Sequence, residues 1–191
     1  MSTLIPLGKA PKSREERQTL ISEQVAHEER IANMGLAHVK KAIVDYLLSE
    51  KGYNAEDLEV ERDFRIELGD AVFTVKADIV LKVEGRIFLL VKCAMTSPES
   101  WERYTVAMCR VACNEAIPYC LVTDGEYAGL IDVRTGKSVS ERFEQLPSKQ
   151  EALRIVRDVS SSPFACEKAE KEKRILFAFE GLGCTAAKEG Q

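Results

Sequence analysis

Two neighbouring stretches near the middle of the chain have the apolar patterns of β-strands. From residue 75 to residue 83 every second residue is apolar and most of the residues between are charged, which predicts a strand with one buried face. Residues 87–91 are apolar without interruption, as in a central strand covered on both faces. Glu84-Gly85 is a tight-turn signal, so the two stretches are predicted to form a hairpin.

Three further strands are predicted around this hairpin. Residues 58–68 alternate between apolar and polar side chains, and Gly69-Asp70 then turns the chain into the strand that covers residues 72–83. Residues 117–123 and 127–133 are short apolar stretches that end at turn residues. Five strands are therefore expected.

Helical spacing of apolar residues appears on both sides of the strands. A long helix is predicted from about residue 23 to residue 50, where Gly52 ends it. Ser13 followed by Glu16 is a capping-box pattern, which indicates a helix start at Ser13 as well. Later helices are predicted from Pro98 to about residue 113, after Pro147-Ser148, and over residues 167–180 with an end at Gly181.

The order helix, three strands, helix, two strands predicts an α/β domain with a mixed sheet and helices packed on it. We divide the chain into an N-terminal arm with a short helix at 1–22, a domain at 23–140 and a helical extension at 141–191. The apolar end of the last helix is expected to dock on the domain or on a protein partner.

Composition narrows the class of protein. The 191 residues are 45% hydrophobic and 30% charged, which is enough for one full core. No window offers 18 consecutive apolar residues and the first residues lack a signal-peptide pattern, so we expect a cytoplasmic protein without membrane contact. The formal net charge of −4 argues against a broad surface for nucleic acid, although a local basic cleft is compatible with it.

Cysteine and histidine spacing gives no metal motif. The sequence has no C-x-x-C, and four cysteines lie within apolar strand or helix patterns, so free buried thiols are expected, with a zinc or iron-sulfur site and redox pairing as alternatives. No role is assigned to Cys166 and Cys184. His27 and His38 have no ligand partner at a suitable spacing and are expected at the surface or the core edge. We expect no cofactor.

Three segments together resemble a known family. They are Glu59-Val60-Glu61, Ala77-Asp78-Ile79-Val80 and the run from Phe88 to Ala94. Over about residues 28–139 the chain is similar to the N-terminal domain of type I restriction enzyme R subunits, a branch of the PD-(D/E)XK nucleases. This resemblance implies a restriction-endonuclease-like αβββαβ core with a mixed central sheet flanked by helices, here followed by a C-terminal helical extension.

The resemblance also indicates a degenerate catalytic motif. Asp78 stands where that family has its metal-binding aspartate, whereas the Glu-x-Lys positions fall on Lys92 and Ala94. Such nucleases use two carboxylates to hold a divalent cation and a lysine to support the transition state. With Lys92 replacing the acid, we expect weak or absent metal binding, and an ion pair between Lys92 and Asp78 instead.

Three functions follow as hypotheses. The first is a catalytically degenerate nuclease-like domain that acts as a nucleic-acid-binding or assembly module in a restriction or DNA-processing context. Its candidate contacts to DNA are basic residues: Lys76, Lys82, Arg86, Lys92, Arg103 and Arg110. Trp101 and Tyr104 would stack on bases, or else pack within the fold.

The second hypothesis is an active Mg²⁺-dependent DNA endonuclease with displaced catalytic groups. Asp78 would remain a metal ligand, and Lys92 or Lys76 would take the role of the catalytic lysine, which supplies a positive charge. The displaced acid would be Glu28, Glu59 or Glu61, and Glu28 could equally be a solvated charge on an outer helix face. The third hypothesis is a purely structural interaction module whose partner binds the C-terminal helix.

Overall fold

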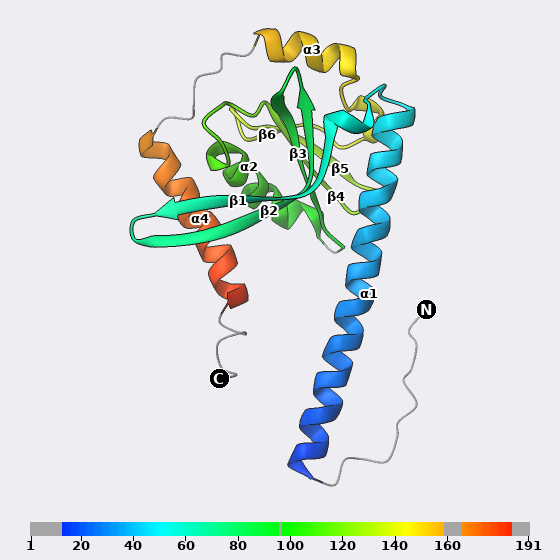
Figure 1. The fold of residues 1–191 in the computed structure, drawn as a ribbon, viewed down its shortest axis with the longest axis vertical. Helices are drawn as coiled ribbons and strands as arrows, with labels where there is room; N and C mark the ends of the chain where they lie inside the picture. The colour runs from blue at the N-terminus through cyan, green and yellow to red at the C-terminus, as the bar shows by residue number, and fades with distance from the viewer. Residues whose placement is uncertain (1–12, 96, 159–165, 185–191) are drawn as a thin grey trace.

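The computed structural model describes residues 13–95, 97–158 and 166–184, and within them a six-stranded mixed sheet has helices on both faces (Figure 1). The strands are β1 (Leu58–Leu68), β2 (Ala71–Val83), β3 (Arg86–Cys93), β4 (Tyr119–Thr123), β5 (Ala128–Asp132) and β6 (Lys137–Ser140). The α-helices are α1 (Arg14–Ser49), α2 (Glu102–Val111), α3 (Lys149–Asp158) and α4 (Cys166–Cys184). Short 3₁₀ helices cover Ala55–Asp57, Pro98–Trp101 and Phe143–Gln145.

The strands lie in the sheet in their chain order, β1-β2-β3-β4-β5-β6. Only the β3–β4 pair is parallel, and the chain crosses between these two strands through Pro98–Trp101 and α2. The other four pairs are antiparallel. The predicted mixed α/β architecture is therefore confirmed.

The β2–β3 hairpin forms as its sequence predicts. Val83 pairs with Arg86, and the two turn residues, Glu84 and Gly85, have φ angles of 52° and 77°. Positive φ at both positions is the geometry of a two-residue hairpin turn that matches strand twist, and glycine adopts it without steric cost. Residues 88–91 are at most 1% exposed, so β3 is the predicted central strand.

Helices bury a separate apolar cluster on each face of the sheet. On one face α1 contributes Val39, Ile43 and Leu47, and α3 contributes Ala152 and Val156. On the other face the buried residues of α2 and Leu176 of α4 pack against β-strand side chains. The C-terminal extension thus docks on the domain, which was one of its two predicted sites.

The first helix is longer than predicted. It starts at Arg14, and the Ser13 hydroxyl accepts a hydrogen bond from the Glu16 backbone N–H at 3.0 Å, which confirms the capping signal. The predicted start near residue 23 is wrong, because no proline or glycine interrupts the chain between Ser13 and Gly35. Residues 1–12 of the predicted arm lie outside the described residues, and the division of the chain at residue 23 stays a prediction.

Two helix boundaries differ from the predictions, and one strand was not predicted. α4 continues through Gly181 to Cys184 instead of ending at the glycine. Pro98 begins a 3₁₀ turn, so α2 itself begins only at Glu102. Strand β6 was not predicted, because its single apolar residue, Val139, is 55% exposed and leaves no apolar pattern. Among the helices of the described ranges, none has the length and apolar character needed to cross a membrane.

Candidate functional site

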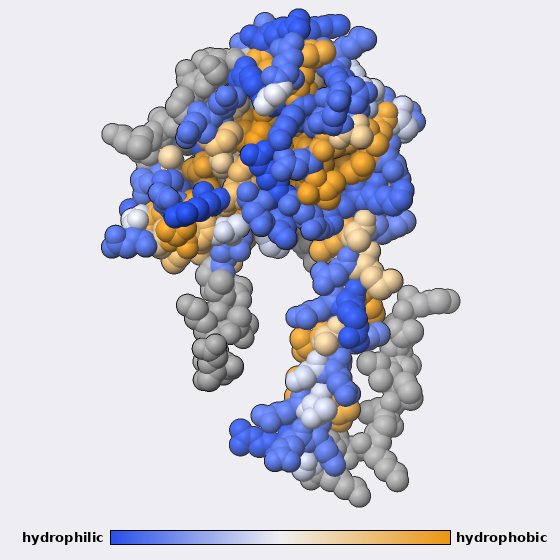
Figure 2. All heavy atoms as spheres, in the orientation of Figure 1, coloured by the Kyte–Doolittle hydropathy of each residue, from blue (hydrophilic) through white to orange (hydrophobic). Residues whose placement is uncertain are grey.

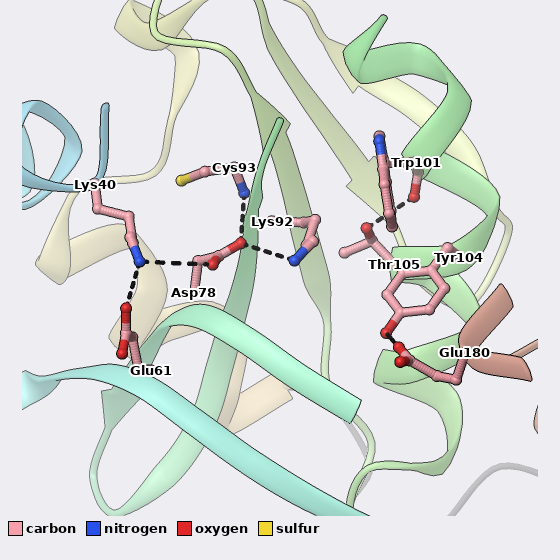
Figure 3. A network of polar contacts seen from close by, with 9 residues as sticks. All are labelled: Lys40, Glu61, Asp78, Lys92, Cys93, Trp101, Tyr104, Thr105 and Glu180. Carbon is pink, nitrogen blue, oxygen red and sulfur yellow. Dashed lines mark hydrogen bonds and ion pairs between the residues drawn. The ribbon is translucent and has the colours of Figure 1, made fainter. Parts of the chain in front are cut away.

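Asp78 is a buried carboxylate on β2, the second strand of the sheet, with only 6% of its surface exposed. One side-chain oxygen, Oδ2, accepts a hydrogen bond from the Cys93 backbone N–H at 2.8 Å and lies 3.2 Å from Lys92 Nζ (Figure 3). The other oxygen, Oδ1, lies 4.0 Å from Lys40 Nζ. The predicted Asp78–Lys92 ion pair is present, and a second lysine approaches from α1.

Lys40 is the residue of this site that the sequence analysis missed. Its side chain is 16% exposed, and its Nζ donates a hydrogen bond to Glu61 while it faces Asp78. On α1 it directly follows Val39, which belongs to the buried apolar stripe. A lysine beside such a stripe is a weak signal, and only the packing of α1 against the sheet identifies its acidic partners.

Glu61 on β1 lies opposite Asp78. The neighbouring pairs Val60–Ile79 and Arg62–Ala77 fix this register. Glu61 has a φ of 58°, in the left-handed region that residues other than glycine rarely adopt, and such a conformation costs on the order of 1–3 kcal/mol. We call Lys40, Glu61, Asp78 and Lys92 the Asp78 cluster, whose two acids and two bases sum to zero formal charge.

Electrostatics within the Asp78 cluster favour the charged forms of Glu61 and Lys40. The hydrogen bond from Lys40, its charge and the charge of Lys76 lower the pKa of Glu61. Burial alone would lower the pKa of Lys40, but the hydrogen bond to Glu61 and the charge of Asp78 raise it overall. Burial, followed by the charge of Asp78, raises the pKa of Cys93 to about 12. The Cys93 thiol is therefore protonated and a poor nucleophile at neutral pH.

Aromatic residues border the cluster on its α2 side. Lys92 Nζ lies 5.4 Å from the centre of the Trp101 ring, within cation–π range. Trp101 and Tyr104 are in edge-to-face contact, and both pack against Phe179 of α4. The Tyr104 hydroxyl donates a hydrogen bond to Glu180 at 2.6 Å. Tyr104 is 2% exposed and takes the packing role that was one of its two predicted roles.

The other predicted acids are not brought to Asp78. Glu28 lies twelve residues before Lys40 on α1, about 18 Å along the helix axis, and accepts a hydrogen bond from Gln24. Glu59 is paired with Lys82 at 2.6 Å and with Arg62 at 3.2 Å. Among the predicted displaced acids, only Glu61 is placed in the cluster.

Most of the predicted nucleic-acid contacts have acceptors inside the fold. Lys82 pairs with Glu59, and Arg86 donates to the Val156 carbonyl at 2.8 Å. Arg103 and Arg110 both pair with the buried Glu172 of α4. Lys76 is exposed and lies on the same strand as Asp78, two residues before it.

The side chains of the Asp78 cluster do not fit a divalent cation. Mg²⁺ prefers an octahedron of oxygen ligands, whereas the Asp78 oxygens face two ammonium groups and a backbone N–H. Within the described ranges, no three His, Cys, Asp or Glu residues gather as a metal site. Cys93, Cys109 and Cys120 are buried and Cys113 is half-buried, while the side chains of Cys166 and Cys184 lie outside the described residues.

Comparison with known proteins identifies a matching family. A family model described as type I restriction enzyme R protein N terminus (HSDR_N) matches residues 37–147, more than half of the chain. No curated protein and no solved structure matches the chain. The matched range starts three residues before Lys40 and includes all six strands, so the Asp78 cluster lies entirely within it.

Proposed function

The chain belongs to the type I restriction enzyme R protein N-terminal family, and we propose that its nuclease-type site is catalytically silent and that it acts as an assembly module. The context would be restriction or DNA processing in the cytoplasm. The observation that supports this most strongly is that β3 brings no second carboxylate to Asp78, only the Lys92 ammonium at 3.2 Å. An ammonium there neutralises the acid that would otherwise attract a cation.

We propose a restriction-endonuclease-like core for the domain. The order α1, β1, β2, β3, α2, β4 corresponds to αβββαβ, with Asp78 on the second strand and Lys92 on the third. In this alignment Lys92 fits the lysine of Glu-x-Lys better than the glutamate, because it touches Asp78, whereas Ala94 lies beyond the end of β3. Leu90 then occupies the place of the acid. With either assignment, β3 supplies no second carboxylate.

Assembly is favoured over nucleic-acid binding as the role of the module. Lys82, Arg86, Arg103 and Arg110 have acceptors within the fold, so phosphate contacts would have to compete with them. The formal net charge of −4 also opposes a general attraction to DNA. Among the predicted nucleic-acid contacts, the exposed Lys76 is the residue whose binding to phosphate would compete least with contacts inside the fold.

A second candidate function is an active endonuclease with a rearranged site. Glu61 favours it, because this acid lies opposite Asp78 and is half-exposed. Metal binding would then require Lys40 and Lys92 to withdraw from the two carboxylates. Their withdrawal would leave two partly buried ammonium groups without their carboxylate partners, which counts against this candidate.

Calorimetric titration with Mg²⁺ or Mn²⁺ separates the two candidates. We expect no saturable binding at millimolar metal, because the two lysines already compensate the Asp78 charge. The matched control is Asp78→Asn, which keeps the side-chain shape and removes the charge. Saturable binding by the unmodified protein that disappears in Asp78→Asn would support the endonuclease and contradict the silent site.

A further inference from the structure

The N-terminal half of α1 projects away from the domain. In Figure 1 the helix extends well beyond the sheet, and in Figure 2 apolar patches lie along the projecting part. Its exposed large apolar side chains are Leu20, Ile21, Val25, Ile31 and Met34, which are 47–74% exposed. Among the described residues, buried positions of α1 occur only from Val39 onward.

The helix separates from its own domain near Gly35. A Cβ atom at Gly35 would lie 2.6 Å from Met95 Cε, so the absence of a side chain allows this close contact. Before Gly35, the side chains of α1 are not buried against the described parts of the domain. The helical conformation of this segment therefore depends on its intrinsic helix propensity. Because unpacked helices are marginal in water, a partner on the exposed apolar residues would stabilise this segment.

One stripe of the projecting helix carries charges of opposite sign toward its two ends. Its members follow alternating spacings of three and four residues, which place them on a single helical face. They are Arg14, Arg17, Ile21, Gln24, Glu28 and Ile31. The stripe carries two arginines near its N-terminal end and Glu28 toward its C-terminal end. At its centre Ile21 is flanked by Leu20 and Val25.

We propose that residues 14–31 of two copies of this chain pair as antiparallel helices about a two-fold axis between residues 22 and 23. In this register Arg17 faces Glu28 of the second copy, Ile21 faces Gln24, and Arg14 faces Ile31. Two-fold symmetry makes each contact twice and gathers Leu20, Ile21 and Val25 of both copies at the centre. A parallel, in-register pair would instead place Arg17 against Arg17 and Glu28 against Glu28.

The length of the projecting segment suits this pairing. Eighteen residues of helix span about 27 Å, and the paired stretch ends at Ile31, before Gly35 and the domain contact. The two domains therefore lie at opposite ends of the helix pair. The pairing surface is separate from the Asp78 cluster. An experiment that contradicts the dimer therefore leaves the proposed silent site untouched, and the reverse also holds.

Sedimentation equilibrium of the full chain tests the pairing. We expect a reversible monomer–dimer equilibrium and a dimer at about 100 µM, a concentration that saturates a micromolar interface. Arg17→Glu places like charges at both Arg17–Glu28 contacts and should weaken dimerisation about tenfold or more. The double variant Arg17→Glu/Glu28→Arg reverses both charges and should restore most of the affinity. Arg30→Glu, on the opposite helix face, is the matched control and should leave the dimer unchanged.

Two outcomes would overturn the proposal. A monomer over the whole concentration range would exclude a second copy as the occupant of this helix face. A dimer that Arg17→Glu leaves intact would place the interface elsewhere. All substituted side chains are exposed, and circular dichroism verifies that each variant remains folded.

Discussion

Replacing Asp78 with alanine is expected to destabilise the folded protein by about 3–5 kcal/mol, the usual cost of leaving a buried charge without its partner. The substitution leaves Lys92 and Lys40 facing each other across the vacated position, each less than one-fifth exposed. It also leaves the Cys93 backbone N–H without its acceptor. Urea unfolding followed by fluorescence of Trp101, the single tryptophan, measures the change.

A double variant separates charge compensation from general damage at this position. Asp78→Ala/Lys92→Met removes both members of the closest pair, and we expect it to recover a substantial part of the lost free energy of unfolding. Lys92→Met alone should cost less than Asp78→Ala, because Asp78 keeps Lys40 and the Cys93 N–H. A loss below about 1 kcal/mol for Asp78→Ala would contradict a buried and mutually dependent cluster.

Replacing Glu172 with alanine is expected to cost about 2–3 kcal/mol and to loosen α4. Glu172 is 4% exposed, and its Oε1 accepts a hydrogen bond from Arg110 at 2.7 Å while Arg103 pairs with the other oxygen. The cost lies below the Asp78 value because Arg103 is half-exposed and can turn into water. Hydrogen exchange in α4, together with urea unfolding, measures both effects.

Glu170→Ala is the matched control for the Glu172 variant. Glu170 lies one half-turn earlier on α4, and its ion-pair partner among the described residues is Lys173, at 3.0 Å across the helix surface. We expect its loss to cost about 0.5 kcal/mol or less and to leave exchange in α4 unchanged. Equal effects of the two substitutions would show that the Glu172 ion pairs do not hold α4 on the domain.

The sheet could be predicted because its strands have strong local patterns. The uninterrupted apolar residues 87–91 and the Glu84-Gly85 turn define a central hairpin without any tertiary information. Strand β6 has no such pattern, since it is a polar edge strand held by main-chain hydrogen bonds to β5. The continuation of α4 past Gly181 could not be predicted from local sequence either. A single glycine costs a helix only about 1 kcal/mol, so it does not have to end the helix.

Half of the Asp78 cluster could be predicted in the same way. Asp78 and Lys92 lie on strands joined by a short hairpin, so their proximity follows from strand pairing. Lys40 could not be found, because its place depends on how α1 crosses the sheet. Glu61 was one of three candidate acids: the register of β1 against β2 distinguishes it from Glu59, and the position of Glu28 on α1 excludes that residue.

The most direct measurement is cleavage of supercoiled, linear and single-stranded DNA by the purified protein with Mg²⁺ or Mn²⁺. Asp78→Asn and Glu61→Gln, which preserve side-chain shape and are checked for folding, serve as variants. We expect no cleavage by the unmodified protein above the level of these variants. The ammonium groups of Lys40 and Lys92 face the Asp78 oxygens that a metal ion would have to bind. Cleavage that is abolished by Asp78→Asn would contradict a silent site and establish a working, rearranged nuclease.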